Sequence, residues 1–433
     1  MAPAMDMSEG LPARAAAQAV LSEVLRKRRP LDLALESIRN LPARDAGFAR
    51  AIASETFRRL GQIEALVRHF VPKAPSPHKA GPTLEILFAG VCELLFLDVP
   101  AHAAVDAANR LAQTDNKAVH FKSLINAVLR RVSREGKDLI ATQDAARLNT
   151  PDWLWTRWCN GYGEQTARKL ADAHCRQPPI DIVLKHSDSL QALEGERLFA
   201  NVVRLTDPSR VDALPGFAEG DWWVQDAAAT LPARLLGDVR GQTVLDLCAA
   251  PGGKTMQLAA MGAKVIAVER EAERLERVRE NLARTKLDAT LVRADIRDFR
   301  LDAPAPFVLL DAPCTATGTI RRHPELPWIK SASDVNLCEQ AASELLDAAA
   351  NMVAPSGILV FAVCSLEPEE GIGQAQAFLS RDARFVRHAV TPDELYGMAE
   401  LISADGDLRT MPFHLADKGG MDGFYAARFK RVS

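Results

Sequence analysis

Two cysteines and an acid follow apolar runs in the C-terminal half of this 433-residue chain. The run at 307–310 ends at Asp311 and is followed by Cys314. A second run, at 358–363, is followed directly by Cys364. A single free cysteine is usually a small buried apolar side chain, but two thiols and a carboxylate at strand ends form a set that can do nucleophilic chemistry. The pattern therefore favours a covalent catalytic site.

Methylation of a pyrimidine carbon is one reaction that needs such a set. C5 of cytosine is a poor nucleophile, but a thiolate that adds at C6 turns the ring into an enamine whose C5 can attack a sulfonium methyl group. An acid near N3 assists the addition, and a base must then remove the C5 proton before the thiolate leaves. The attacking cysteine must be a thiolate. By this chemistry alone, either thiol could attack.

The residues 244–255, VLDLCAAPGGKT, predict a strand, a glycine turn and the start of a helix. Ligands of open α/β sheets bind where strands end, and glycine lets the backbone approach them closely. The spacing matches neither the Walker motif nor GxGxxG. Glu269, at the end of the next predicted strand, suits a ribose diol, with a surface carboxylate as the alternative. Asp295, after the third strand, could reach the base of the same ligand.

Strands and helices must alternate to position these residues. From about 242 the apolar runs are short and continuous, as in buried parallel strands. This order predicts a doubly wound parallel sheet whose fourth and fifth strands are neighbours, about 5 Å apart, so that both thiols face one crevice. The segments near 385–388 and 423–429 could add a hairpin at the sheet edge. The expected strands are 243–247, 264–268, 290–292, 307–310 and 358–363, and the expected helices run to Met261 and over 271–285 and about 336–352.

The N-terminal third predicts helices alone. Apolar residues recur there at i, i+3 and i+4, and the breakers 73–77 and 98–100 separate the segments. We therefore expect an all-α domain at 1–145, a small mixed connecting segment at 146–235 with short strands at 180–184 and 202–205, and an α/β domain at 236–433. The expected helices are 15–25, 46–59, 63–71, 83–97, 104–112 and 122–133.

Composition narrows the class of protein. The chain is 48% hydrophobic and 25% charged, as in ordinary globular proteins. Its seven cysteines form no CxxC pair, so neither a metal site nor a disulfide framework is indicated, and free thiols suit a reducing compartment. The N-terminal residues hold no signal peptide, and no apolar run is long enough to span a membrane. We expect a cytoplasmic protein.

The net charge of −3 is unevenly distributed. Residues 1–150 contain 21 Lys and Arg against 16 Asp and Glu, and the remainder contains 32 against 40. A basic N-terminal part is compatible with binding a polyanion, but the charge alone favours the simpler explanation of solvated helix faces. Arg321, Arg322 and His323 follow the Cys314 loop and could line a path for RNA or form a solvated loop.

Three segments together resemble the Sun-type RNA cytosine-C5 methyltransferase family. They are LDLCAAPGGKT (245–255), DAPCTATGTIRRHPE (311–325) and CSLEPEE (364–370). The resemblance implies a Rossmann-like domain that binds S-adenosylmethionine, with its last strand antiparallel. It implies that Cys364 is the nucleophile, that Cys314 assists elimination and that Asp311 contacts the cofactor region and the target cytosine. The implied cofactor-binding residues are Cys248, Ala249, Ala250, Pro251, Gly252, Gly253, Lys254, Glu269, Asp295 and Asp311.

Three positions, Cys314, Glu269 and Thr315, bear on this assignment. Pro313-Cys314 has the form of the nucleophile motif of DNA cytosine methyltransferases, but the CSLEPEE context favours Cys364. Glu269 stands where the family often has Asp, and Thr315 stands where Ser is frequent. Both changes keep the functional group that the mechanism needs.

The N-terminal part resembles a NusB-type RNA-binding domain, through Val99-Pro100, Asn109-Arg-Leu and LINAVLRR (124–131). Pairing that domain with this catalytic domain implies small-subunit (16S) ribosomal RNA as the substrate, with no metal and no membrane partner. Two alternatives stay open at this point. The same chemistry could act on tRNA or DNA, or the chain could be an RNA-binding assembly or transcription factor in which methylation is secondary.

Overall fold

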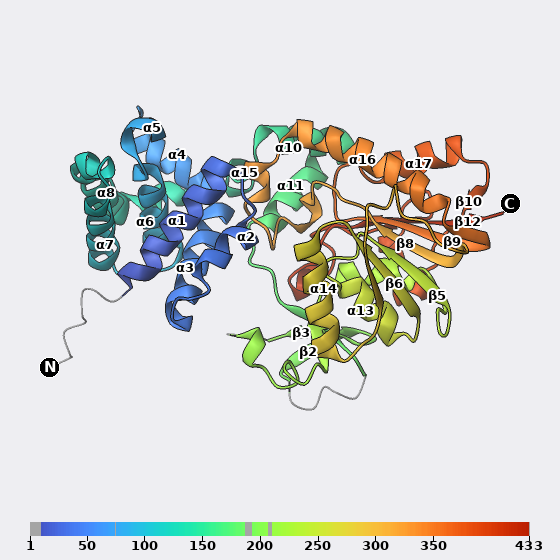
Figure 1. Ribbon diagram of the computed structural model, residues 1–433. Coiled ribbons are helices and arrows are strands. Elements are labelled where there is room, and N and C mark those ends of the chain that lie inside the picture. The colour runs from blue at the N-terminus through green and yellow to red at the C-terminus, as the bar shows by residue number, and fades with distance from the viewer. Residues whose placement is uncertain (1–9, 74, 187–192, 207–209, 433) are drawn as a thin grey trace. The chain divides into compact units, whose positions relative to one another are not determined.

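A computed structural model of the chain describes residues 10–432 except 74, 187–192 and 207–209 (Figure 1). The chain forms two compact units. We call the first the helical unit; it contains Met1–Arg176 and also Ile320–Ser331. The second, the α/β unit, contains Gln177–Thr319 and Ala332–Ser433. This grouping divides the segment 146–235 between the two units.

The helical unit contains no strand among its described residues, so the prediction of an all-α N-terminal part is confirmed. Its helices bury the apolar residues that recur at helical spacing. In α8, for example, Ile125, Val128, Leu129 and Val132 are all buried on one face. The helices are α1 (Leu11–Lys27), α2 (Leu31–Leu35), α3 (Ala43–Arg58), α4 (Leu60–Phe70), α5 (Pro77–Ala80), α6 (Thr83–Phe96), α7 (Ala101–Thr114), α8 (Lys122–Ala141), α9 (Ala145–Leu148), α10 (Asp152–Tyr162), α11 (Glu164–His174) and α15 (Leu326–Ile329).

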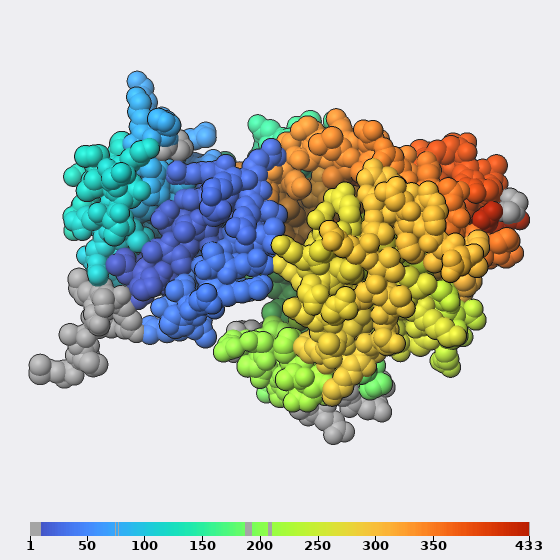
Figure 2. All heavy atoms as spheres, viewed as in Figure 1, coloured from blue at the N-terminus to red at the C-terminus, as the bar shows by residue number. Residues whose placement is uncertain are grey.

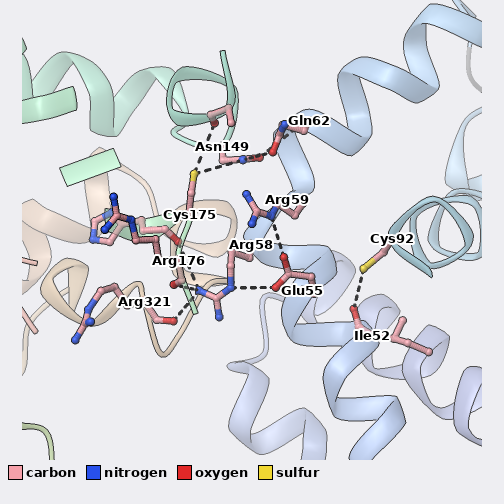
Figure 3. Close-up of polar contacts among 12 residues, drawn as sticks. Ile52, Glu55, Arg58, Arg59, Gln62, Cys92, Asn149, Cys175, Arg176 and Arg321 are labelled. Atoms are coloured by element: carbon pink, nitrogen blue, oxygen red, sulfur yellow. Dashed lines mark hydrogen bonds and ion pairs between the residues drawn. The ribbon is translucent and has the colours of Figure 1, made fainter. Parts of the chain in front are cut away.

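The segment Ile320–Ser331, which follows the Cys314 loop, is held inside the helical unit. Arg58 Nη1 donates to the carbonyl oxygen of Arg321 at 2.8 Å and to that of Arg176 at 3.2 Å (Figure 3). The Trp328 indole N–H donates to the Phe57 carbonyl at 3.0 Å. Residues more than 260 positions apart in the chain thereby become parts of one packed core.

The α/β unit begins with a small antiparallel sheet in the order β2-β3-β1-β4. The short strands expected at 180–184 and 202–205 are confirmed as β1 and β3. A buried ion pair joins these two strands: Arg204 Nε lies 2.7 Å from Asp181 Oδ1. The elements are β1 (Asp181–Leu184), β2 (Gly195–Phe199), β3 (Val202–Leu205), β4 (Trp222–Val224) and the following helix α12 (Ala227–Arg234).

The larger sheet has the strand order β10-β12-β9-β8-β5-β6-β7 among the described residues, with β11 paired to β12. The strands from β9 to β7 in this order are parallel, and β12 is antiparallel to β9. The predicted parallel sheet and its antiparallel last strand are therefore confirmed, as is the neighbourhood of the fourth and fifth expected strands, now β8 and β9. The strands are β5 (Thr243–Leu247), β6 (Lys264–Glu269), β7 (Thr290–Arg293), β8 (Ala305–Asp311), β9 (Val353–Val363), β10 (Phe385–Arg387), β11 (Leu408–Arg409) and β12 (Tyr425–Arg431).

Helices cover both faces of this sheet, as strand alternation requires (Figure 1). Val244 and Val360 pack on one face with residues of α12, α13 and α14. Leu245 and Phe361, one residue further along each strand, pack on the other face with α16 and α17. In the space-filling view of the same face, yellow and gold atoms cover the region where Figure 1 draws the strands (Figure 2). The helices are α13 (Gly253–Ala260), α14 (Ala272–Thr285), α16 (Ala332–Ala350) and α17 (Ile372–Arg381).

The edge strands differ from a simple hairpin. β10 pairs antiparallel with β12 as expected, but residues 388–424 separate them in the chain, and β12 lies inside the sheet between β9 and β10. Among the described residues, no helix is both long enough and apolar enough to cross a membrane.

Candidate functional site

The glycine loop connects β5 to α13 and begins with an unusual backbone conformation. Cys248 has a φ of +62°, and burial raises the pKa of its thiol far above the usual range. Gly252 is the N-cap of α13 with a φ of +103°, a conformation that strongly favours glycine. A Cβ at Gly252 would meet Val278 Cγ1 at 3.2 Å, and one at Gly253 would meet Gln225 Cδ at 3.3 Å. Both glycines thus also make room for neighbouring packing.

Glu269 lies beside this loop, at the end of β6. Its side chain is buried, and its Oε2 accepts a long hydrogen bond of 3.4 Å from the Ala250 N–H. Its Oε1 accepts a bond of 3.1 Å from the Glu271 N–H. The Arg274 guanidinium also lies 3.6 Å from Oε2. These contacts are long, and each carboxylate oxygen can accept more than one hydrogen bond, so the group has acceptor capacity left for a diol.

Asp295 follows β7 and is already engaged. Its carboxylate accepts hydrogen bonds from the Arg297 guanidinium at 2.9 and 2.8 Å, and from the Arg297 N–H. These contacts lower the pKa of Asp295 to about 2, so the group is ionised at neutral pH.

A partly buried ion pair joins the glycine loop to the end of β8. Lys254 Nζ lies 2.7 Å from Asp311 Oδ2, and the ammonium also lies over the Phe424 ring, 5.1 Å from its centroid. Burial opposes the charge on Lys254, but Asp311 outweighs it, and the pKa of Lys254 is raised. β5 and β8 flank the point where the strand order reverses, which is where ligands of such sheets bind.

The two predicted thiols are brought together at the same edge. Cys314 Sγ lies 3.5 Å from Cys364 Sγ, and one of the two thiols donates to the other. The hydrogen bond with Cys364, and then burial, raise the pKa of Cys314, so Cys314 keeps its proton at neutral pH. All seven cysteines are free. The pair can therefore provide one reactive sulfur and one neutral thiol at a single position.

The basic residues after the Cys314 loop do not form one surface. The Arg321 side chain is buried, only 1% exposed, inside the helical unit. Arg322 is exposed, and His323 is half-buried, with its Nδ1 3.6 Å from Asp32 Oδ2. Of the three residues considered for an RNA path, the structure therefore assigns Arg321 to packing.

Sequence reasoning missed a buried polar network behind the two thiols. Its centre is Glu370, whose carboxylate accepts hydrogen bonds from Thr315 and Ser365. The available signal was the motif CSLEPEE itself, in which Glu367 and Glu370 are buried although Glu369 between them is exposed.

Two family models match the chain in separate regions. Residues 233–430 match the model described as 16S rRNA methyltransferase RsmB/F. Residues 11–134 match the NusB family.

Curated relatives match over almost the whole chain. Ribosomal RNA small subunit methyltransferase B from Vibrio cholerae serotype O1 is 35% identical over 436 residues, which is 96% of each chain. The protein of the same name from Cronobacter sakazakii is 35% identical and covers 87% of this chain and 91% of its own.

Solved structures show a similar fold. PH0851 superposes with a TM-score of 0.77 over 98% of this chain and 99% of its own, at 23% identity. A methyltransferase homolog protein from Pyrococcus horikoshii covers 64% of this chain and 93% of its own, with a TM-score of 0.53 and 25% identity.

Proposed function

Since the chain belongs to the RsmB/F family of 16S rRNA methyltransferases, with an N-terminal NusB domain, we propose that it methylates C5 of a cytosine in that RNA through a covalent bond from Cys364. The observation that carries this proposal is the 3.5 Å approach of Cys314 Sγ and Cys364 Sγ beside Asp311, at the carboxyl ends of neighbouring parallel strands.

The glycine loop and the acids around it would hold the cofactor. S-adenosylmethionine supplies the methyl group, as a sulfonium. Glu269, with its weakly occupied oxygens, would accept hydrogen bonds from the ribose hydroxyls, and Asp295 would lie near the adenine. The backbone of Cys248–Lys254 would enclose the remainder. The pair of Lys254 and Asp311 closes this side of the site and orients the Asp311 carboxyl group.

Cys364 would attack C6 of the target cytosine, forming the Sγ–C6 bond and leaving C5 nucleophilic. Asp311, at the end of the neighbouring strand, would bind the ring near N3 and share a proton with that nitrogen, so that the ring can take up the electron pair displaced by the addition. After the methyl group has been added, a solvent base takes the C5 proton, the electron pair of the C5–H bond restores the ring double bond, the Sγ–C6 bond breaks and Cys364 recovers its thiolate. Cys314, within 3.5 Å of the attacking sulfur, would assist this elimination. The net change replaces C5–H by C5–CH₃ and releases one proton.

The chain would divide its work among three parts: RNA binding by residues 1–145, connection by 146–235 and catalysis by 236–433. A target base must leave its stack to reach a crevice of this kind, so we expect an accessible cytosine as the substrate. The proposed chemistry uses no metal, and an RNA substrate of this kind implies action in the cytoplasm.

The roles of the two thiols predict opposite phenotypes. Cys364→Ala removes the nucleophile and should lower methyl transfer by roughly a thousandfold or more, with no covalent RNA adduct. Cys314→Ala leaves the attack intact but slows elimination, so a protein–RNA adduct should accumulate. The measurement is methyl transfer from labelled S-adenosylmethionine to 16S rRNA, with adducts separated in a denaturing gel.

A matched control is Cys159→Ala, because Cys159 lies in α10 of the helical unit. This variant should keep wild-type activity and form no stable adduct. Accumulation of the adduct in Cys364→Ala but not in Cys314→Ala would reverse the two roles.

A further inference from the structure

Glu370 bridges the residues that directly follow the two thiols. Its Oε1 accepts a hydrogen bond of 2.8 Å from the Thr315 N–H, and its Oε2 accepts one of 2.6 Å from the Thr315 hydroxyl. The Ser365 hydroxyl donates to the same Oε2. Thr315 follows Cys314, and Ser365 follows Cys364, so one carboxylate is bonded to both catalytic loops.

Further bonds hold the same two loops at a fixed separation. The Thr317 hydroxyl oxygen accepts from the Leu366 N–H at 2.9 Å and lies 3.2 Å from Ser365 Oγ. The Gly318 N–H donates to the Cys364 carbonyl at 3.0 Å. A Cβ at Gly318 would lie 1.9 Å from the Gly423 carbonyl oxygen, so no larger residue fits this approach.

Burying a carboxylate at this contact costs desolvation free energy. Glu370 is 1% exposed, and burial raises the pKa of its carboxyl group while the bonds from Ser365 and Thr315 lower it. A well-packed apolar contact could join two loops without desolvating a carboxylate. A carboxylate, however, has rigid, directional acceptor sites that set the position of each donor. A carboxylate therefore suits a contact that must hold the two catalytic loops at a fixed distance from each other.

We propose that Glu370 is a positioning residue that sets the separation of the Cys314 and Cys364 sulfurs. It acts through Thr315 and Ser365 and touches neither the RNA nor the cofactor. With the sulfurs held 3.5 Å apart, the second thiol is in reach as soon as the first has bonded to the base. The consequence for turnover rests on the proposed function, but the separation itself does not.

The test is Glu370→Gln in the full-length protein, with Glu369→Gln as its matched control. Glu369 is the preceding residue and is exposed. The amide introduced by Glu370→Gln keeps one acceptor oxygen but replaces the other with an NH₂ group, so the Thr315 and Ser365 hydroxyls lose the charged acceptor that they share and the two loops are held less firmly. Glu370→Asp keeps the charge with a shorter reach and should recover part of the loss.

The first readout measures the separation without any RNA. Diamide oxidises two nearby thiols to a disulfide and takes up their two electrons and two protons. We expect the rate of Cys314–Cys364 disulfide formation, followed by mass spectrometry of the linked peptides, to fall at least tenfold in Glu370→Gln. It should stay within twofold of wild type in Glu369→Gln.

The second readout is catalysis. In Glu370→Gln, kcat should fall 10- to 100-fold with KM for RNA and for S-adenosylmethionine within threefold of wild type, and a covalent RNA adduct should accumulate. If Glu370→Gln does not fold, Thr315→Val removes one hydroxyl of the same joint and should shift both readouts in the same direction.

A disulfide rate in Glu370→Gln within twofold of wild type would overturn the proposal, whatever happens to activity. A raised KM with unchanged kcat would also overturn it. Failure of the proposed thiol roles would be seen separately, as the absence of any adduct in Cys314→Ala with the disulfide rates still responding to Glu370.

Discussion

At the scale of single residues, surroundings decide what each titratable group in this site can do. Cys248 and Cys314 are both kept neutral, the first by burial and the second by its hydrogen bond to Cys364 and by burial. Lys254 stays charged although it is buried, because Asp311 lies 2.7 Å away. A buried charge is tolerated only with such a partner, and here the partner also lies at the proposed catalytic centre.

Glu269 and Glu271 allow a matched test of the ribose contact. Glu269 is buried beside the glycine loop, whereas Glu271 is exposed two residues later. Hydrogen bonds to a charged group contribute about 1.5–3 kcal/mol, so Glu269→Gln should weaken S-adenosylmethionine binding by roughly 10-fold or more. Glu271→Gln should leave it unchanged. Calorimetric titration without RNA measures both, and equal affinities would exclude Glu269 as a ligand of the cofactor.

At the scale of elements, the residues of the proposed site follow the ends of strands, but part of the connection after β8 belongs to the other unit. Residues 312–319 after β8 stay in the α/β unit and carry Cys314, whereas Ile320–Ser331 packs in the helical unit. Within this segment Glu325 is buried: its Oε1 accepts from the Leu31 N–H at 3.2 Å, and its Oε2 has no hydrogen-bond partner among the described residues.

Glu325 should make the stability of the helical unit depend on pH. Burial raises its pKa from the usual 4.5 to about 7, so the folded state holds this proton more tightly than the unfolded state. The stabilisation is complete below pH 4.5 and is lost as the pH rises through 7. Glu325→Gln removes this titration, so the variant should gain up to roughly 3 kcal/mol over wild type on going from acid to alkaline pH.

Thermal unfolding of both proteins at about pH 5 and about pH 8 measures this difference. The control is Glu164→Gln, because Glu164 is an exposed carboxylate of the same unit. Its difference from wild type should not change with pH. A pH-independent difference for Glu325→Gln would show that this carboxyl group titrates near its ordinary value.

At the scale of the whole molecule, the helical unit is more than an N-terminal attachment, because it contains a piece of the catalytic region's sequence. The Arg58 guanidinium donates to the carbonyl oxygens of Arg176 and Arg321 (Figure 3). The indole N–H groups of Trp153 and Trp328 add hydrogen bonds within the same unit. The family-typical segment 311–325 is therefore shared between two packed cores.

Variants of Arg58 and Arg59 distinguish the anchoring of residues 320–331 from the general effect of losing a positive charge. Both guanidinium groups pair with Glu55, but only Arg58 is bonded to the Arg321 carbonyl (Figure 3). Arg58→Gln leaves buried carbonyls without their donor and should cost about 2–4 kcal/mol, whereas Arg59→Gln should cost about 1 kcal/mol or less. Hydrogen exchange at the amides of 320–331 should rise in the first variant only. Equal exchange in both variants would contradict an anchoring role for Arg58.

The sequence by itself determined the elements and the residues at their ends. Helical periodicity located α1, α3, α4, α6, α7 and α8 but missed the short helices α2 and α5. Continuous apolar runs located β5 to β9, and motifs named the thiols and acids that follow these strands. Such signals are local, because they depend on neighbours within one turn or one strand.

Only the tertiary structure decided which side chains meet. The thiol pair joins residues 50 apart, and the contact of Arg58 with Arg321 joins residues 263 apart. These contacts depend on how whole elements pack, which no local pattern encodes. For this reason the sequence could place Cys314 and Cys364 at neighbouring strand ends, but it could reveal neither the joint at Glu370 nor the burial of Arg321.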